Sequence, residues 1–271
     1  MKLNKTDIKI SSAFSKLDGT RILHISDLHL AGRNKRMERY FEKLGKIKSD
    51  FVMVTGDLID NDDGIEWCLK YLKKLSPRFG IWACLGNHDK FGLSILHTLF
   101  FHLMGTLKEN NFELLGRRLK ESGIQILINE KKTINVNSVP LTIIGVDAPF
   151  GLDRCKNKNM FSKKITPLRE LFSNIPPKNY VVLLNHVPDL LKELGDVKIN
   201  LALCGHTHGG QIRLPFIGPL VAFSSFQRAY NKGLYNYNGY YLHVSGGLGA
   251  SKTTSIRLFC PPEATILTLR S

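Results

Sequence analysis

The sequence predicts a mixed α/β (α+β) fold in which two β-sheets pack face to face and helices flank them. Three short apolar runs, at residues 21–26, 51–56 and 80–86, are separated by two segments with helical spacing. Strands and helices that alternate in this way form right-handed βαβ units and a sheet with helices packed on it. More apolar runs follow in the second half with fewer helices between them, which predicts a sheet richer in hairpins.

The first elements are read from hydrophobic periodicity. "RILHIS" and "FVMVTG" are compact apolar runs that end in Ser or Gly followed by Asp, a pattern typical of buried strands. Between them, "KRMERYFEKLGKI" carries apolar residues at helical spacing, including Met37 and Phe41, and "IEWCLKYLKKL" (65–75) repeats this pattern before the third strand, "GIWACLG". The later strands are expected in "IQILIN", "KTINVN", "LTIIGV", "YVVLLN", "INLALCG", "YYLHVS" and "ATILTL".

Length and composition indicate one folded domain over residues 1–271. The 271 residues are 43% hydrophobic and 23% charged, and no repeat or Pro/Gly/Ser-rich linker divides them. Five cysteines are scattered without a CxxC pair, which disfavours a disulfide framework or a zinc–thiolate site and favours a reducing compartment.

The expected location follows from the N-terminal sequence and from the net charge. The first 19 residues contain no apolar core of a signal peptide, and no apolar run reaches the roughly 20 residues of a spanning helix. The formal net charge of +15 attracts phosphate groups of nucleic acid, anionic lipid or a small substrate, although a merely soluble surface is the simpler interpretation. We expect a cytoplasmic monomer, or one peripheral to the inner face of a membrane.

Polar side chains follow five of the expected strands directly. They are Asp27 and His29 in "SDLHL", Asp57 in "TGDLID", Asn87, His88 and Asp89 in "LGNHD", His186 in "NHVPD", and His206 and His208 in "CGHTHGG". Each of these taken alone is explained by a turn, a helix cap or a satisfied histidine. Five consecutive coincidences of that kind are improbable, so we interpret the strand ends as one site. The histidines at 24, 97, 102 and 243 are expected to be structural.

Imidazoles, carboxylates and an amide oxygen at one sheet edge are ligands of first-row divalent metals. Cysteine is nearly absent from the set, which disfavours a closed structural zinc site. Seven candidate ligands exceed what one ion with an open position needs, and they suit two ions that share a carboxylate. Nitrogen and oxygen ligands are compatible with Mn (manganese), Fe, Zn, Co or Ni.

The motifs "SDLH", "TGDLID", "LGNHD", "NHVPD" and "CGHTHGGQIRLP", in this order, resemble the calcineurin-like metallophosphoesterase superfamily from about residue 20 to the end. The closing segment "SGGLGASKTTSIRLFCPPEATILTL" is similar to a bacterial branch whose members often carry an N-terminal membrane anchor, and the sequence leads us to expect no such anchor here. The resemblance implies a helix-flanked β-sandwich with a di-metal site at one edge.

The resemblance also implies residue roles. Asp27, His29 and His208 would bind a first metal, Asn87, His186 and His206 a second, and Asp57 would bridge them. His88 matches the proton donor of the family, and Asp89 matches the carboxylate that orients it. The expected reaction is hydrolysis of a phosphoester or phosphoanhydride by attack of a metal-bridging hydroxide, without a phosphoenzyme.

Residues 91–122 are expected to form a helical cap insertion that bears on the substrate. In "LSILHTLFFHLMGTL" (93–107), read as a helix, one broad face is apolar and the other lacks a formally charged side chain. The simple interpretation is that this segment packs on the core. The sharper one is a cap for acyl chains or an anionic membrane surface, with Leu96, Phe100, Phe101, Arg117 and Arg118 as contacts.

Three functions remain open at this point. UDP-2,3-diacylglucosamine pyrophosphatases of the same superfamily combine a basic helical lid with a lipid-linked diphosphate, and such a substrate leads our expectations. A nucleic-acid or cyclic-nucleotide phosphodiesterase would use the same ligands, although the sequence shows no stacking platform of interleaved aromatic residues. A non-catalytic scaffold would keep the fold without the ions.

Overall fold

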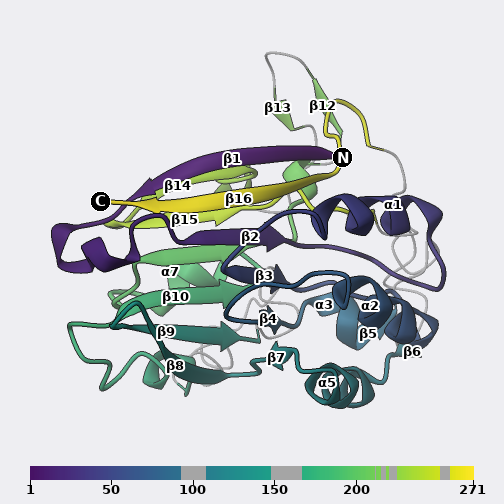
Figure 1. Cartoon of the computed structure of the whole chain (residues 1–271). Coiled ribbons are helices and arrows are strands. Elements are labelled where there is room, and N and C mark those ends of the chain that lie inside the picture. The colour runs from purple at the N-terminus through teal and green to yellow at the C-terminus, as the bar shows by residue number, and fades with distance from the viewer. Residues whose placement is uncertain (93–107, 148–166, 211, 215–217, 220–224, 251–256) are drawn as a thin grey trace.

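Two six-stranded sheets form the centre of the molecule (Figure 1). The structure is a computed structural model and describes residues 1–92, 108–147, 167–210, 212–214, 218–219, 225–250 and 257–271. The first sheet has the order β1-β16-β2-β3-β4-β7. Its strands are β1 (Lys2–Lys9), β16 (Glu263–Arg270), β2 (Arg21–Ile25), β3 (Phe51–Thr55), β4 (Ile81–Cys84) and β7 (Gln125–Ile126).

The second sheet has the order β14-β15-β11-β10-β9-β8. Its strands are β14 (Gly233–Tyr237), β15 (Tyr240–Val244), β11 (Leu201–Cys204), β10 (Tyr180–Asn185), β9 (Val139–Val146) and β8 (Glu130–Val136). The outer pairs β8–β9 and β14–β15 are antiparallel hairpins. Two small pairs, β5 (Phe91–Gly92) with β6 (Lys108–Glu109) and β12 (Arg213–Leu214) with β13 (Gly218–Pro219), lie outside both sheets.

Parallel pairing determines where the polar motifs lie. Strands β2, β3 and β4 run parallel in the first sheet, and β9, β10, β11 and β15 run parallel in the second. The strand ends are also in step, because Ile25 pairs with Val54 and Thr55 pairs with Cys84. Carboxyl ends of parallel strands lie at one edge of a sheet, so the loops that follow them gather there.

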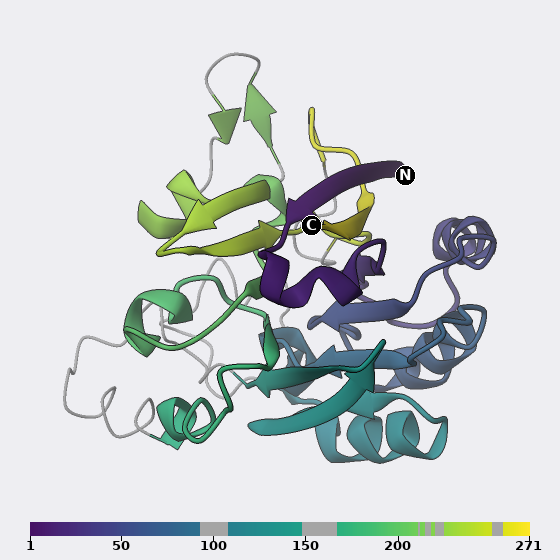
Figure 2. The same ribbon diagram turned by 60° about the vertical axis from the view of Figure 1, so that its left-hand side comes forward.

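Helices cover the outer faces of both sheets, which gives four layers (Figure 2). The first sheet carries α1 (Lys35–Leu44), α2 (Ile65–Leu72) and α5 (Phe112–Glu121), and the second carries α7 (Leu190–Leu194) and α8 (Ser225–Ala229). A short α3 (Asn87–Lys90) follows β4, and 3₁₀ turns occupy Ser12–Leu17, Asp62–Gly64 and His208–Gly210.

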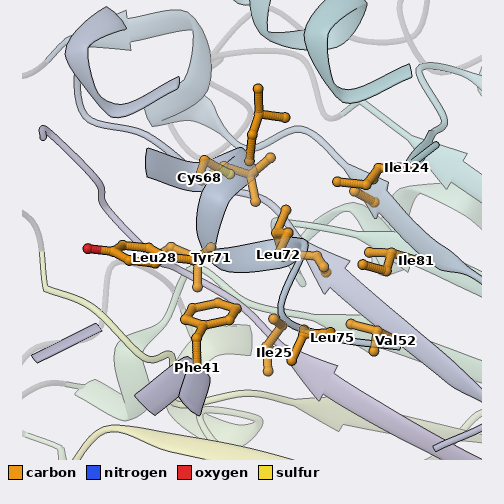
Figure 3. Close-up of a cluster of buried hydrophobic side chains, with 14 of the residues drawn as sticks. Ile25, Leu28, Phe41, Val52, Cys68, Tyr71, Leu72, Leu75, Ile81 and Ile124 are labelled. Carbon is orange, nitrogen blue, oxygen red and sulfur yellow. The ribbon is translucent and has the colours of Figure 1, made fainter. Parts of the chain in front are cut away.

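Helix α1 shows how sequence and packing agree. Its N-cap is Asn34, whose side-chain oxygen accepts hydrogen bonds from the backbone N–H groups of Arg36 and Met37. The buried face of α1 includes Phe41, whose ring stacks on Tyr71 of α2 at a centroid distance of 5.6 Å. Figure 3 shows this pair to the left of Val52 and Ile81 of the first sheet. Each such large side chain contributes about 1.5–3 kcal/mol by leaving water.

The core between the two sheets is mainly apolar. Strands of both sheets supply its side chains, among them Phe51, Trp82 and Leu184. Near it, His24 Nδ1 of β2 lies 2.7 Å from His243 Nδ1 of β15, so the two buried imidazoles join the sheets through one hydrogen bond. This contact accounts for two of the histidines that the sequence analysis treats as structural.

The predicted two-sheet fold with flanking helices is confirmed. Strand β7 is shorter than the apolar run around it, and β1 was not predicted at all, because its Lys-rich sequence belongs to an exposed edge strand. None of the helices in the described ranges is both long and apolar enough to cross a bilayer.

Only part of the predicted cap insertion at 91–122 falls within the described ranges. Its C-terminal part, α5, buries Leu115 and Leu119 in the core of the first sheet. On the same helix Arg117 is exposed, and the Arg118 guanidinium lies 2.6 Å from the Glu66 carboxylate of α2. The predicted helix 93–107, with Leu96, Phe100 and Phe101, lies outside the described residues.

Candidate metal centre

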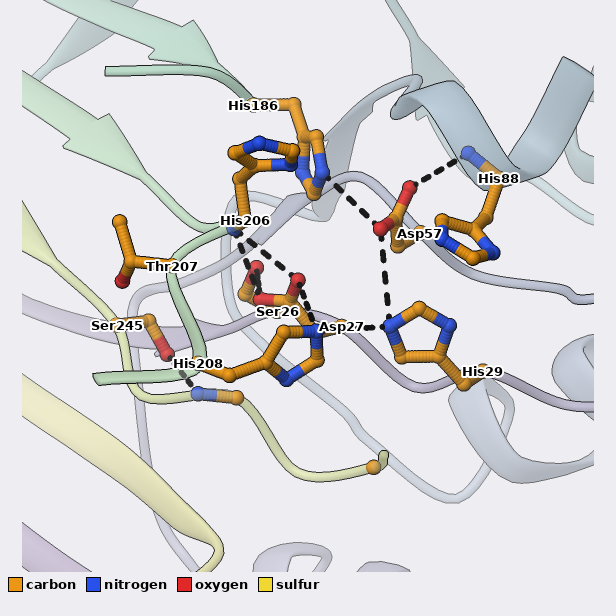
Figure 4. A network of polar contacts seen from close by, with 12 residues as sticks. Ser26, Asp27, His29, Asp57, His88, His186, His206, Thr207, His208 and Ser245 are labelled. Carbon is orange, nitrogen blue, oxygen red and sulfur yellow. Dashed lines mark hydrogen bonds and ion pairs between the residues drawn. The ribbon is translucent and has the colours of Figure 1, made fainter. Parts of the chain in front are cut away.

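All nine polar residues singled out at the strand ends lie in loops, a 3₁₀ turn or the short helix α3 at one edge of the two sheets. The loop after β2 supplies Asp27 and His29, the loop after β3 supplies Asp57, and the loop after β11 supplies His206 and His208. Figure 4 shows the side chains of these loops facing one another, together with His88 and His186. Residues more than 150 positions apart in the chain thus meet at one point.

A first group of possible metal ligands consists of Asp27, His29, Asp57 and His208. Their ligand atoms all lie within 4.8 Å of one another. His208 Nε2 is 3.5 Å from Asp27 Oδ1, and His29 Nε2 is 3.6 Å from Asp57 Oδ2. Two carboxylates and two imidazoles at this spacing suit a first-row divalent cation.

A second group consists of Asp57, His186 and His206. His186 Nε2 lies 3.1 Å from Asp57 Oδ2, so the Asp57 carboxylate belongs to both groups. Asn87, which directly precedes His88, is the first residue of α3. Its side-chain oxygen is buried without a hydrogen-bond partner among the described residues. A buried amide oxygen costs free energy unless something binds it, and a cation would do so.

The backbone at this edge is unusual in the same places. Five of the seven candidate ligands have positive φ angles, at 53° for Asp27, 48° for His29, 51° for Asp57, 70° for His206 and 49° for His208. Residues other than glycine adopt this region at a cost of order 1–3 kcal/mol each, and such residues cluster at functional sites. The fold maintains this strain where it positions the candidate ligands.

Two of the histidines are oriented by hydrogen-bond acceptors behind them. His29 Nδ1 lies 2.7 Å from Asp60 Oδ1, and His186 Nδ1 lies 2.8 Å from the Thr55 carbonyl oxygen. When Nε2 binds a cation in place of a proton, the remaining ring proton lies on Nδ1, and an acceptor there receives it. In both residues Nε2 is the atom that faces Asp57.

The carboxylate beside His88 is Asp60, not Asp89. His88 Nδ1 lies 3.2 Å from Asp60 Oδ1, whereas Asp89 accepts hydrogen bonds from the backbone N–H groups of Leu58, Ile59 and Gly86. Asp89 therefore holds two loops together, and the orienting contact expected of it comes from Asp60. Sequence reasoning missed Asp60, although its place three residues after Asp57 in "GDLID" was a usable signal.

Burial and neighbouring charges act against each other in this site. Burial alone would lower the pKa of His186, but the Asp57 carboxylate raises it to about 10. For Asp57, burial favours the neutral acid, yet His186 and His88 outweigh it and hold the pKa well below its usual range. Burial, with His186 beside it, lowers the pKa of His206 to about 3. Asp57 is therefore a buried anion that needs positive charge next to it.

Glycines allow the loops to approach closely. A Cβ atom on Gly86 would lie 2.2 Å from Asp57 Oδ1, and one on Gly205 would lie 1.9 Å from Ser26 Oγ and 2.7 Å from Asp27 Oδ2. Neither distance is compatible with a side chain. These two glycines bring the ends of β4 and β11 against the carboxylates, which explains why a glycine directly precedes Asn87 and His206.

The C-terminal segment also borders the centre, which sequence reasoning did not foresee. The backbone N–H groups of Leu248 and Gly249 donate to the carbonyl oxygens of Ser26 and Asp27, at 2.9 and 2.6 Å. Arg257 Nη2 lies 3.0 Å from His208 Nδ1, and the Cys260 thiol lies 3.0 Å from the His208 carbonyl oxygen. The motif "SGGLG" at 245–249 was a usable signal for this position, because a strand followed directly by glycines often borders a functional site.

A two-sheet sandwich with such a cluster at the carboxyl ends of its strands defines the class of metal-dependent phosphoesterases. Residues 20–210 match the sequence model of the calcineurin-like phosphoesterases, and the chain belongs to this family. It is accordingly a hydrolase of phosphate esters, as predicted. Residues 211–271, which include Arg257, lie beyond the matched range.

Relatives of known name agree with this membership. The chain is 31% identical over 273 residues to the uncharacterized metallophosphoesterase YkoQ of Bacillus subtilis, covering 97% of this chain and 90% of that protein. It is 27% identical over 311 residues to the UDP-2,3-diacylglucosamine pyrophosphatase LpxG of Chlamydia muridarum, covering 98% and 88%. Among solved structures, the phosphopantetheinyl hydrolase PptH of Mycobacterium tuberculosis has a TM-score of 0.50 at 13% identity, covering 88% and 91%, and shows the fold alone.

Proposed function

We propose that the protein is a di-metal phosphohydrolase whose first ion is held by Asp27, His29 and His208 and whose second is held by Asn87, His186 and His206. Asp57 would bridge the two ions. The observation that carries this proposal is that the Asp57 carboxylate belongs to both groups of possible ligands. The unpartnered oxygen of Asn87 supports the second group, because an amide oxygen is a suitable ligand for a hard or borderline cation.

A pair of bound divalent cations supplies charge neutralisation at the phosphoryl oxygens and an activated water. The chain's own residues supply the rest. We assign to His88 the role of proton donor to the leaving oxygen. Its Nδ1 lies 3.2 Å from Asp60 Oδ1, and its backbone N–H donates to Asp57 Oδ1 at 2.9 Å. A positioned general acid contributes typically about 10²–10⁴-fold in rate. Burial of Asp57 and His186 keeps bulk water away from the charged groups.

The first test replaces the shared carboxylate. Asp57→Asn keeps the shape of the side chain and removes its charge, so we expect metal content to fall from two ions per chain and turnover of bis-p-nitrophenyl phosphate to drop by about 10³-fold. Asp63→Asn, an exposed acidic residue of the neighbouring turn, is the matched control and should change neither quantity. Full turnover by Asp57→Asn at unchanged metal content would contradict the proposal.

For the substrate we propose a lipid-linked diphosphate, of the kind named for LpxG, presented at an anionic membrane surface. The net charge of +15 supports a negatively charged partner. Within the described residues, Leu258 and Phe259 are 44% and 65% exposed and directly follow Arg257, which contacts the centre. Exposed apolar side chains beside a phosphate-handling site suit a substrate with an acyl tail.

The substrate test compares chemical classes directly. Protein loaded with manganese should release phosphate or nucleotide from a diacylated sugar nucleotide faster than it cleaves single-stranded DNA or a cyclic nucleotide. Leu258→Ser combined with Phe259→Ser should lower turnover of the acylated substrate and leave bis-p-nitrophenyl phosphate unaffected. Preference for DNA or for a cyclic nucleotide would replace the lipid by the second class of substrate.

A further inference from the structure

Arg257 has an unexpected position behind one of the candidate ligands. Its guanidinium donates to the carbonyl oxygens of Gly246 at 2.7 Å, Cys260 at 3.4 Å and Gly249. The same group reaches the ring of His208, with Nη2 at 3.0 Å from Nδ1. The backbone of the C-terminal segment thus holds the guanidinium charge against the Nδ1 edge of the His208 ring, whereas Nε2 faces Asp27.

A guanidinium only donates hydrogen bonds, which determines where His208 carries its proton. Because Arg257 donates to Nδ1, that nitrogen has no proton of its own, and the ring proton of neutral His208 lies on Nε2. Nε2 is the atom that faces the other ligands, at 3.5 Å from Asp27 Oδ1 and 3.1 Å from His29 Nε2. His208 therefore presents an N–H group, not a lone pair, to the first group.

The contrast with the other histidines is clear. His29 and His186 place an acceptor at Nδ1, namely the Asp60 carboxylate and the Thr55 carbonyl oxygen. When Nε2 of such a ring binds a cation, the remaining ring proton lies on Nδ1, where these acceptors receive it. A donor in the same place has the opposite effect. Before Nε2 of His208 can bind a cation, its proton must move to Nδ1, where it would face the N–H of Arg257.

We propose that Arg257 is a positioning residue that locks His208 in the form that cannot bind a metal, so that a cation enters the first group only when Arg257 leaves Nδ1. This inference deepens the proposed function, since it concerns the same centre. Arg257 keeps backbone carbonyl partners at Gly246 and Cys260 when it releases the ring. The first group accordingly holds its ion less tightly than the second, whose histidine His186 has an acceptor behind it.

The proton positions are tested first, on metal-free protein with ¹⁵N-labelled histidine. Long-range ¹H–¹⁵N spectra distinguish the two neutral forms of imidazole, and His208 is assigned by its loss in His208→Gln. We expect the proton of His208 on Nε2, and we expect Arg257→Met to remove that preference. A proton found on Nδ1 of His208 in the wild-type protein would overturn the proposal.

Metal binding gives the second readout, by titration with Mn²⁺ followed by electron paramagnetic resonance. We expect two classes of site in the wild type and a tightening of the weaker class by about 10-fold in Arg257→Met. Arg213→Met is the matched control, because Arg213 donates to the Gly209 carbonyl oxygen at 2.8 Å and to Asn231 without a recorded contact to the His208 ring. It should leave both classes unchanged.

The variants separate a donor effect from a charge effect. Arg257→Lys keeps the charge and a donor, and we expect wild-type affinities from it. Tighter binding in Arg257→Met without a change in the His208 proton would show that charge alone acts, and would overturn the lock. If Arg257→Met does not fold, the wild-type spectrum and Arg257→Lys still decide. If the protein does not cleave phosphoesters but the His208 proton and the Mn²⁺ affinities are as expected, the proposed function is wrong and the inference about Arg257 remains.

Discussion

At the scale of single residues, the candidate metal centre depends on which hydrogen-bond acceptor contacts the Nδ1 atom of each histidine. Asp60 contacts both His29 and His88, at 2.7 and 3.2 Å, although it belongs to neither the Asp27 group nor the His186 group. In the function proposed above, such a carboxylate would orient a metal ligand and the proton donor at once, and so couple metal binding to proton transfer. The effect of losing it should therefore appear in both.

Asp60→Asn is expected to lower kcat by about 10–100-fold and to weaken metal binding by a similar factor, as for other residues that orient a ligand. An amide can still accept one hydrogen bond, but it removes the negative charge beside the two imidazoles. Steady-state kinetics and Mn²⁺ titration measure the two effects. Asp63→Asn serves again as control, and a normal kcat in Asp60→Asn would exclude the orienting role.

At the scale of elements, close approach between strand ends shapes the site. Gly205 leads out of β11 with no room for a Cβ atom, whereas Gly116 lies inside α5 with nothing within 4 Å of its missing Cβ. The same substitution should therefore have opposite effects at the two positions. The contrast separates tight packing from ordinary helix propensity.

Gly116→Ala is expected to stabilise the protein by about 0.5–1 kcal/mol, because alanine loses less conformational freedom in a helix. Gly205→Ala should destabilise it by about 1–3 kcal/mol and reduce activity, since the new methyl group pushes Asp27 and Ser26 apart. Thermal unfolding measures both changes. A stable, fully active Gly205→Ala protein would show that the loop after β11 adapts more freely than the geometry indicates.

The motifs predicted which residues cluster at the strand ends better than they predicted the surroundings of that cluster. Asp57 and His206 were found because they follow apolar strands in short, recognisable patterns. Asp60 and Arg257 were missed because their importance depends on contacts between loops 31 and 49 residues apart, which no local pattern records. For the same reason, β1 was missed, since only its pairing with β16 makes "KLNKTDIK" a strand.

At the scale of the whole molecule, a buried histidine pair joins the two sheets. Burial lowers the pKa of His24 well below its usual value and lowers that of His243 to about 4. Both rings are therefore neutral in the folded protein, while in the unfolded chain they titrate near their ordinary value of about 6.5. Below that value the unfolded state binds protons that the folded state does not.

The contribution of this histidine pair to stability is consequently expected to be largest above about pH 6.5 and to fall as the pH drops toward 4, by about 1.4 kcal/mol per pH unit for each proton taken up. Urea unfolding at several pH values measures this slope. His243→Gln removes one of the titrating groups and should flatten the slope, even if it lowers stability overall. An equal slope in wild type and variant would locate the pH dependence elsewhere.

The place of β16 between β1 and β2 has a consequence for how the protein is made. A ribosome releases the chain from its N-terminus, so β2, β3 and β4 emerge long before the last strand that completes their sheet. Until residues 263–270 leave the exit tunnel, β2 has an open edge and β1 has no neighbour. The first sheet is therefore complete only after residues 263–270 have been synthesised, and a chain that stops before them would expose strand edges and be prone to aggregation.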